Sequence, residues 1–212
     1  MLDWRRARRS LLIATALVSV LGLAIEALHV QQPDAVGETL VAKLSLSYES
    51  NLPTWFASSL LLLCAVAAGA IAMRAPRHRL YWWSMAALAG WMSLDEAAEL
   101  HEHLGGVIGD TSGVLYFDWV IPAAVLVVAV TIAFVPFIRA LHPRTRTRLI
   151  IACAVYVGGA LLMELPLGWW TEQHGNEGFG YALIDWVEET MELVGSVLAF
   201  GALLAHREET EP

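Results

Sequence analysis

Six long apolar stretches constrain the fold of this chain more than any other feature. A helix that crosses a bilayer needs about 20 mostly apolar residues. Stretches of that kind occur at approximately 10–30, 55–73, 80–104, 115–138, 148–170 and 180–205. The segments between them are short, with no linker and no second apolar unit. We therefore predict an all-α integral membrane bundle of six transmembrane helices, forming a single domain over residues 1–212.

The composition agrees with a membrane protein and excludes other classes. Hydrophobic residues make up 57% of the chain and charged residues 16%, which is more apolar and less charged than an ordinary soluble domain. The net charge of −8 argues against nucleic acid as a partner, because a nucleic-acid binder presents a basic surface. Cys64 and Cys153 both lie within apolar runs, where they are expected to be small core residues rather than a disulfide framework.

The basic residues predict the orientation of the bundle. Cytoplasmic loops of membrane proteins are enriched in Lys and Arg. In this topology twelve of the thirteen basic residues fall on one side, and Lys43 is alone on the other. We expect a multi-pass protein of the bacterial inner membrane with both termini in the cytoplasm. The first apolar stretch also has the features of a signal peptide, but it is long and lacks a good cleavage site near Ala24–Ala27, so we expect it to be retained.

The acidic residues are the most informative feature for function. Of the 21 Asp and Glu, seventeen fall on the outer side or in the outer half of the membrane. Eleven lie inside the predicted spans: Glu26, Asp95, Glu96, Glu99, Glu102, Asp118, Glu164, Asp185, Glu188, Glu189 and Glu192. A carboxylate in hydrocarbon is costly and usually functional. Protonation, a water-filled vestibule or bound cations could each relieve the repulsion among them, and metal is the best single explanation.

Helical spacing brings several of these acids onto common faces. If the third span is one continuous helix, Asp95, Glu99 and Glu102 lie within about 60° of one another. In the sixth span the four acids of "DWVEETMEL" lie within about 100°. Because the two helices run in opposite directions, the two sets can face each other. The first span adds the Glu-x-x-His pair Glu26 and His29.

These faces predict a metal site in the outer half of the bilayer. The expected ligands are Glu99, Glu102, His103, Glu164, Glu189, Glu192, Asp95, Glu188, Glu26 and His29. Carboxylates with one or two imidazoles on facing helices are the pattern of di-iron and di-manganese bundles, although only Glu26 and His29 match the Glu-x-x-His motif. Oxygen-rich sites also suit calcium and magnesium, whereas few histidines and misplaced cysteines fit zinc poorly. The simpler alternative is that the outermost acids line a wet vestibule, and that the histidines make ordinary hydrogen bonds.

Two strings resemble those of a known group of proteins. "SLDEAAELHE" in the third span and "VEETMELVG" in the sixth are similar to the S-x-D-E…H-E and E-E-x-x-E motifs of an uncharacterised family of bacterial multi-pass membrane proteins. That resemblance carries no activity. Ser93 and Asp95 are also loosely similar to membrane zinc hydrolases of the alkaline ceramidase type, but the H-x-x-x-H pair of those enzymes is absent.

Three functions are consistent with these features. The first is a metalloenzyme that acts on a lipid-soluble substrate, by oxidation or hydroxylation with a redox-active metal or by metal-assisted hydrolysis. The second is a transporter or channel for divalent cations or protons. The inner halves of the spans are almost purely apolar, however, which favours a site open to one side only. The third is a non-catalytic assembly subunit whose acidic outer face meets a cationic partner.

Overall fold

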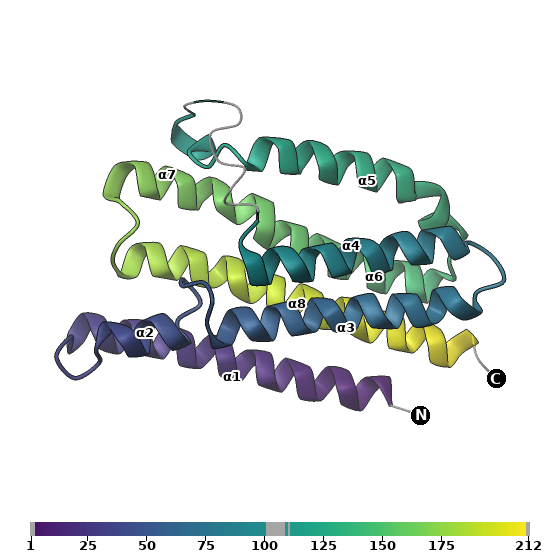
Figure 1. Cartoon of the computed structure of the whole chain (residues 1–212), viewed down its shortest axis with the longest axis horizontal. Coiled ribbons are helices and arrows are strands. Elements are labelled where there is room, and N and C mark those ends of the chain that lie inside the picture. The colour runs from purple at the N-terminus through teal and green to yellow at the C-terminus, as the bar shows by residue number, and fades with distance from the viewer. Residues whose placement is uncertain (1–2, 101–108, 110, 211–212) are drawn as a thin grey trace.

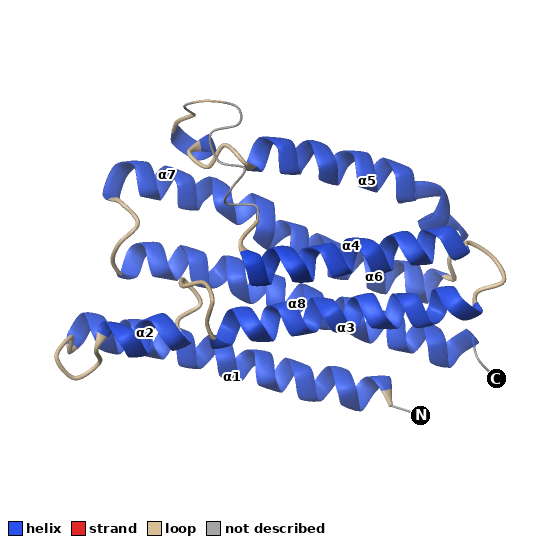
Figure 2. Cartoon of the chain, in the orientation of Figure 1, coloured by secondary structure: helices blue, strands red, loops and turns tan. Residues whose placement is uncertain are grey.

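The computed structural model describes residues 3–100, 109 and 111–210, and the regular elements among them are all helical (Figure 2). These elements are α1 (Trp4–Gln31), α2 (Glu38–Leu44), α3 (Leu52–Arg74), α4 (Arg79–Ala98), η2 (Gly113–Leu115), α5 (Val120–Ala140), α6 (Pro143–Val157), η3 (Gly158–Met163), α7 (Glu164–His174) and α8 (Phe179–Thr210). No strand occurs in these residues, so the all-helical prediction is confirmed for the part of the chain that is described.

Six long helical segments run along a common axis (Figure 1). They are α1, α3, α4, α5, the uninterrupted run α6–η3–α7, and α8. Both termini lie at one end, together with the α3–α4 and α5–α6 connections. We call this the basic end, because Arg5, Arg79, Arg139 and Arg146 lie in the segments that meet there. The opposite end, with the α1–α2 and α7–α8 connections, is called the acidic end.

Four of the segments can cross a membrane by their length and composition. They are Trp4–Gln31, Leu52–Arg74, Val120–Ala140 and Pro143–His174. The other two long helices, α4 and α8, are more polar and carry most of the acidic residues predicted to lie in the membrane. By the length and composition of these helices, the chain has the character of a membrane protein. The short helix α2 follows α1, and its Val41 side chain is buried.

The third segment ends earlier than its hydropathy predicts. The helix α4 stops at Ala98, short of the expected boundary at residue 104. Glu99 adopts the left-handed conformation with φ +52° and closes the helix through a backbone hydrogen bond of 2.7 Å from its N–H to the Asp95 carbonyl. Helical spacing therefore does not relate Glu99 to Asp95, and the expected common face of these two residues does not form. Glu102, the third residue of that face, lies outside the described residues.

The helix α5 is held at its two ends and packs loosely between them. At the basic end Phe137 is completely buried, and its ring stacks on Tyr81 at 5.0 Å and meets Trp82 edge-on at 4.9 Å. At the acidic end η2 leads into Tyr116, which packs on α7 at Gly168. Between these contacts only 6% of the apolar window of α5 is buried. The middle of α5 therefore stands away from the bundle, as its separate ribbon in Figure 1 shows.

Candidate functional site

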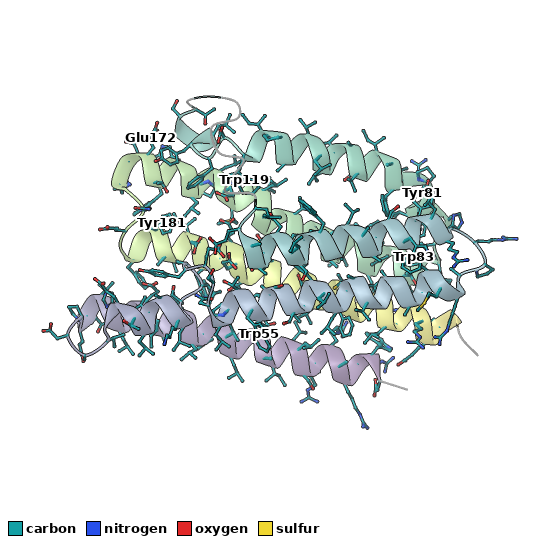
Figure 3. All side chains as sticks on the ribbon, viewed as in Figure 1. Trp55, Tyr81, Trp83, Trp119, Glu172 and Tyr181 are labelled. Carbon is teal, nitrogen blue, oxygen red and sulfur yellow. The ribbon has the colours of Figure 1, made fainter. Side chains whose placement is uncertain are left out.

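A cavity of about 1180 Å³ lies between α5 and the helices α4, α6 and α8. It is larger than the 300–1,000 Å³ or so of most ligand sites. Most of its wall is apolar, with Leu126 and Val130 of α5 facing Ile150 and Val157 of the α6 side. The polar groups gather toward its two ends. Figure 3 shows Trp119 and Tyr181 near the acidic end of the bundle and Tyr81 near the basic end.

Nine carboxylates among the described residues line the cavity, and we call six of them the carboxylate cluster. They are Glu96 of α4, Glu164 of α7, and Asp185, Glu188, Glu189 and Glu192 of α8. Like-charge repulsion couples Glu188 to Glu164, Glu192 and Asp185, and couples Glu96 to Glu192. These side chains therefore lie near one another in space, and α8 supplies most of them.

Three oxygens of the cluster are buried without a hydrogen-bond partner in the described part of the chain. They are Glu164 Oε2, Asp185 Oδ2 and Glu188 Oε2. Glu164 is 9% exposed and Glu188 is 6% exposed. A buried polar atom without a partner is costly, and a buried charge is costlier. Such groups are rare in native proteins and call for a missing partner.

The contact between the α6–α7 segment and α8 depends on glycines. The stretch η3 is a π-helical turn that directly precedes Glu164, and turns of this kind recur at functional sites. A Cβ added at Gly159 would lie 2.8 Å from the Glu188 carbonyl oxygen. A Cβ at Gly195 would lie 2.7 Å from the Tyr156 backbone nitrogen. Small residues thus let the two helices approach closely, which brings Glu164 to Glu188.

Tyr156 is a neutral polar side chain beside the inner part of the cluster. Its hydroxyl lies within hydrogen-bonding reach of the Glu192 carboxylate, and it is close to Glu96 and Glu189. On the other side of the cluster, the Ser47 hydroxyl lies within reach of Asp185. Glu49, from the same loop as Ser47, lines the cavity as well. The cluster therefore includes neutral donors as well as carboxylates.

The predicted ligands divide into those that reach the cavity and those that do not. Glu164, Glu188, Glu189, Glu192 and Asp95 line it. Glu26 is close enough to repel Asp185 but is not part of the cavity wall. His29 does not line the cavity, and its Nδ1 lies 2.7 Å from the Val36 carbonyl oxygen.

The remaining predicted ligands belong to the third segment. Glu99 accepts a hydrogen bond of 2.7 Å from the Ser50 hydroxyl and does not line the cavity. Its placement follows from the early end of α4. Glu102 and His103 lie outside the described residues.

The predicted ligand set did not include several polar residues that line the cavity, among them Glu96, Tyr156 and Glu49. Glu96 takes the place expected for Glu99, since α4 still has regular helical geometry at residue 96. Tyr156 sits in an apolar run, where a buried hydroxyl needs a partner, and that need is a usable signal. Glu49 comes from a loop, and no periodic pattern could have placed it.

The donor set of the cluster is made of oxygens. No histidine that the structure describes lines the cavity. Within residues 3–100, 109 and 111–210, no three His, Cys, Asp or Glu side chains stand in the geometry of a metal centre. Oxygen donors fit hard cations such as magnesium, calcium and manganese. The unpartnered oxygens of Glu164, Asp185 and Glu188 are the atoms that such a cation would need.

The acidic character continues outside the cavity. Tyr48, in the loop after α2, has a pKa raised above its ordinary value by partial burial and by the nearby carboxylates of Glu26, Glu38 and Glu177. These carboxylates come from α1, α2 and the α7–α8 loop. The acidic end of the bundle thus presents a negative surface above the carboxylate cluster, which attracts cations.

Comparison with known proteins identifies a family whose description names no activity. A family model described as a domain of unknown function (DUF8692) matches residues 6–207. No curated protein and no solved structure matches the chain.

Proposed function

Since the chain belongs to the DUF8692 family, described as a domain of unknown function, we infer its function from the site. We propose a membrane-embedded metalloenzyme. In this proposal the carboxylate cluster binds a metal cation in the outer half of the bilayer. The adjoining cavity holds a lipid-soluble substrate. The protein spans the bacterial inner membrane six times, with both termini in the cytoplasm.

The six-span topology is supported by the arrangement of the helices. The polar helices α4 and α8 lie alongside the four apolar ones and have comparable length. The basic residues gather at the end where both termini lie, as cytoplasmic segments require. The end that faces outward is then the acidic end. A fluorescent protein fused after Pro212 should be fluorescent in cells, whereas a periplasmic reporter at the same place should be inactive.

The observation that carries the metal proposal is the set of unpartnered oxygens on Glu164, Asp185 and Glu188. Three carboxylates that repel one another in an apolar wall are stabilised by protonation or by a positive group, and we propose the second. None of the described residues that line this end of the cavity is basic. A divalent cation bound beside these carboxylates would supply the missing charge.

The residues of the cluster have separate tasks in this proposal. Glu164, Asp185 and Glu188 would hold the metal, with Glu189 and Glu192 near enough to complete its shell. When bound, a redox-active ion would supply oxidation or hydroxylation chemistry, and a redox-inert ion would supply metal-assisted hydrolysis. Tyr156 orients Glu192 through its hydroxyl. The apolar walls of the cavity keep bulk water from the substrate.

Metal analysis of purified protein tests the proposal. After expression in metal-replete medium, we expect at least about one Mg, Ca, Mn or Fe ion per chain by elemental analysis. Glu188→Gln keeps the shape of the side chain and removes a ligand charge, so it should lower the metal content to less than about half. Glu177→Gln is the matched control, since Glu177 is an exposed acid of the acidic end. Wild-type protein that binds no metal, or equal content in both variants, would contradict the proposal.

Transport is the main alternative. The cavity extends toward Arg139 and Arg146 at the basic end, and two guanidinium groups oppose the passage of a cation. We therefore favour a site that is open to one side. Metal-dependent uptake into proteoliposomes, abolished by Glu188→Gln, would identify a transporter instead.

A further inference from the structure

The basic end of the cavity has a charge opposite to that of the carboxylate cluster. Arg139, in the last turn of α5, and Arg146, near the start of α6, both line the cavity. Among the described residues that line the cavity, Arg139 and Arg146 are the two basic ones. Arg148, two positions further along α6, is instead engaged by Glu209 at 3.0 Å and by the Trp4 ring at 4.8 Å. Arg139 and Arg146 are therefore placed to meet a ligand within the cavity.

The wall between the two charged ends is apolar. Leu126, Val130 and Val135 of α5 line it, and Leu126 is 59% exposed, so part of this wall is accessible. Apolar space of this size inside a bilayer is not left empty, since its walls would lose their packing contacts. Water gains nothing there, because it finds few polar partners. In a bilayer, the molecules available to fill this space have apolar chains.

The length of the cavity fits a long hydrocarbon chain. The 21 residues of α5 span about 30 Å at 1.5 Å per residue, which is close to the thickness of the hydrocarbon core. The cavity follows α5 from Ala123 to Arg139. A ligand that occupies its length would have one end at the arginines and the other at Glu164 and Glu188.

We infer that the cavity takes a single-chain anionic amphiphile of the fatty-acid type, drawn from the surrounding bilayer. Its carboxylate lies between Arg139 and Arg146, because guanidinium groups bind carboxylates through paired, charge-assisted hydrogen bonds. The carboxylate cluster repels the same head group, so charge fixes the direction of the chain. The far end of the chain then lies at the carboxylate cluster. This inference rests on the proposed function, and it assigns the substrate class and the part of the substrate that reaches the site.

A photoreactive fatty acid tests both the class and the direction. We would incubate full-length protein in nanodiscs of zwitterionic lipid with palmitate that carries a diazirine at its chain end. The corresponding long-chain alcohol serves as the uncharged comparison. Illumination followed by peptide mass spectrometry should place the fatty-acid label within residues 116–123 and 156–167. Label within 139–150, or label spread evenly over the lipid-facing helices, would overturn the inference.

Arginine variants provide the matched control. Arg139→Gln/Arg146→Gln should lower labelling by the fatty acid about tenfold, the loss expected for a charged hydrogen-bonded pair, and should leave labelling by the alcohol unchanged. Arg144→Gln, on the same helix but outside the cavity wall, should behave as wild type. An equal loss in Arg144→Gln, or no loss in the double variant, would overturn the inference. The single variant Arg146→Gln keeps the test available if the double variant fails to fold.

The outcome separates this inference from the proposed metal site. Protein that retains its metal but takes no label at the cluster contradicts the fatty-acid assignment alone. Protein that labels as expected but contains no metal supports this inference and contradicts the metal proposal. Protein that forms a dimer through α5 and takes no label shows that a second copy fills the cavity, and it overturns the inference.

Discussion

The Tyr156 hydroxyl lies within hydrogen-bonding reach of the Glu192 carboxylate, across the contact between α6 and α8. Gly195 makes this possible, because any larger residue would collide with the Tyr156 backbone. The position of the Tyr156 hydroxyl beside the carboxylate cluster therefore depends on the close packing of α6 against α8. A neutral donor beside a buried acid stabilises it without adding another charge.

Tyr156→Phe should destabilise the protein by about 1–3 kcal/mol, since it leaves Glu192 without this donor. Unfolding in detergent, followed by tryptophan fluorescence, measures the change. In a Glu192→Gln background the loss should be smaller, because the amide needs the hydroxyl less than a carboxylate does. Equal losses in both backgrounds would show that Tyr156 acts only through packing.

The glycine contact gives a second prediction. Gly159→Ala places a methyl group against the Glu188 carbonyl oxygen and against Glu192 Cγ, at 2.8 and 3.0 Å. We expect a loss of about 1–3 kcal/mol from overpacking, and a weaker metal site because Glu188 moves away from Glu164. Unfolding and metal content report the two effects separately.

Gly90→Ala is the control for this prediction. A Cβ at Gly90 would meet only Ala65 Cβ at 3.8 Å, an ordinary contact, and alanine favours a helix over glycine by about 1 kcal/mol. Gly90→Ala should therefore be neutral or stabilising. If it destabilised the protein as much as Gly159→Ala, the close approach at η3 would not be the cause.

The sequence predicts the part of the site that lies on an unbroken helix. Asp185, Glu188, Glu189 and Glu192 all fall within α8, so their spacing alone places them together. Hydropathy likewise locates the long segments, since apolar length is what defines a membrane helix. The spacing of the α8 acids and the length of the apolar segments are both properties of the local sequence, so both can be predicted from it.

The rest of the site depends on backbone events that periodicity does not show. The α4 helix ends at Ala98 through the left-handed Glu99, so a wheel drawn past that point selects Glu99 instead of Glu96. The π-helical turn η3 changes the angle between Tyr156 and Glu164. The pairing of Tyr156 with Glu192 also requires the order of the helices, which hydropathy leaves open.

The basic end gives a pH-dependent prediction. His206, just beyond the predicted span 180–205, packs against the Trp82 ring at 4.9 Å and lies 3.3 Å from the Thr145 hydroxyl. Burial lowers its pKa, and His142 lowers it further, whereas Glu209 acts in the opposite direction. Because the folded state disfavours the protonated ring, its contribution is complete above the ordinary pKa of about 6.5 and is lost as the pH falls below it.

The thermal stability of the wild type relative to His206→Gln should therefore fall between pH 7.5 and pH 5, because only the wild type carries this ring. His174→Gln is the control, since His174 is exposed at the acidic end and stacks on Trp170. It should keep the wild-type pH dependence. Identical pH dependence in wild type and His206→Gln would contradict the prediction.

Phe137 should decide whether α5 stays in place as the outer wall of the cavity. It is completely buried among Tyr81, Trp82 and Phe134, and the middle of α5 has little other packing. Phe137→Ala should cost about 3 kcal/mol through the cavity that it leaves, and hydrogen exchange in residues 120–140 should rise well before the remaining helices respond. Ile132→Ala is the matched control, because Ile132 is 67% exposed on the same helix, and it should change neither quantity. If exchange in α5 rose no more than in α3, the aromatic contact would not be what holds this wall, and the cavity would depend on contacts at the acidic end alone.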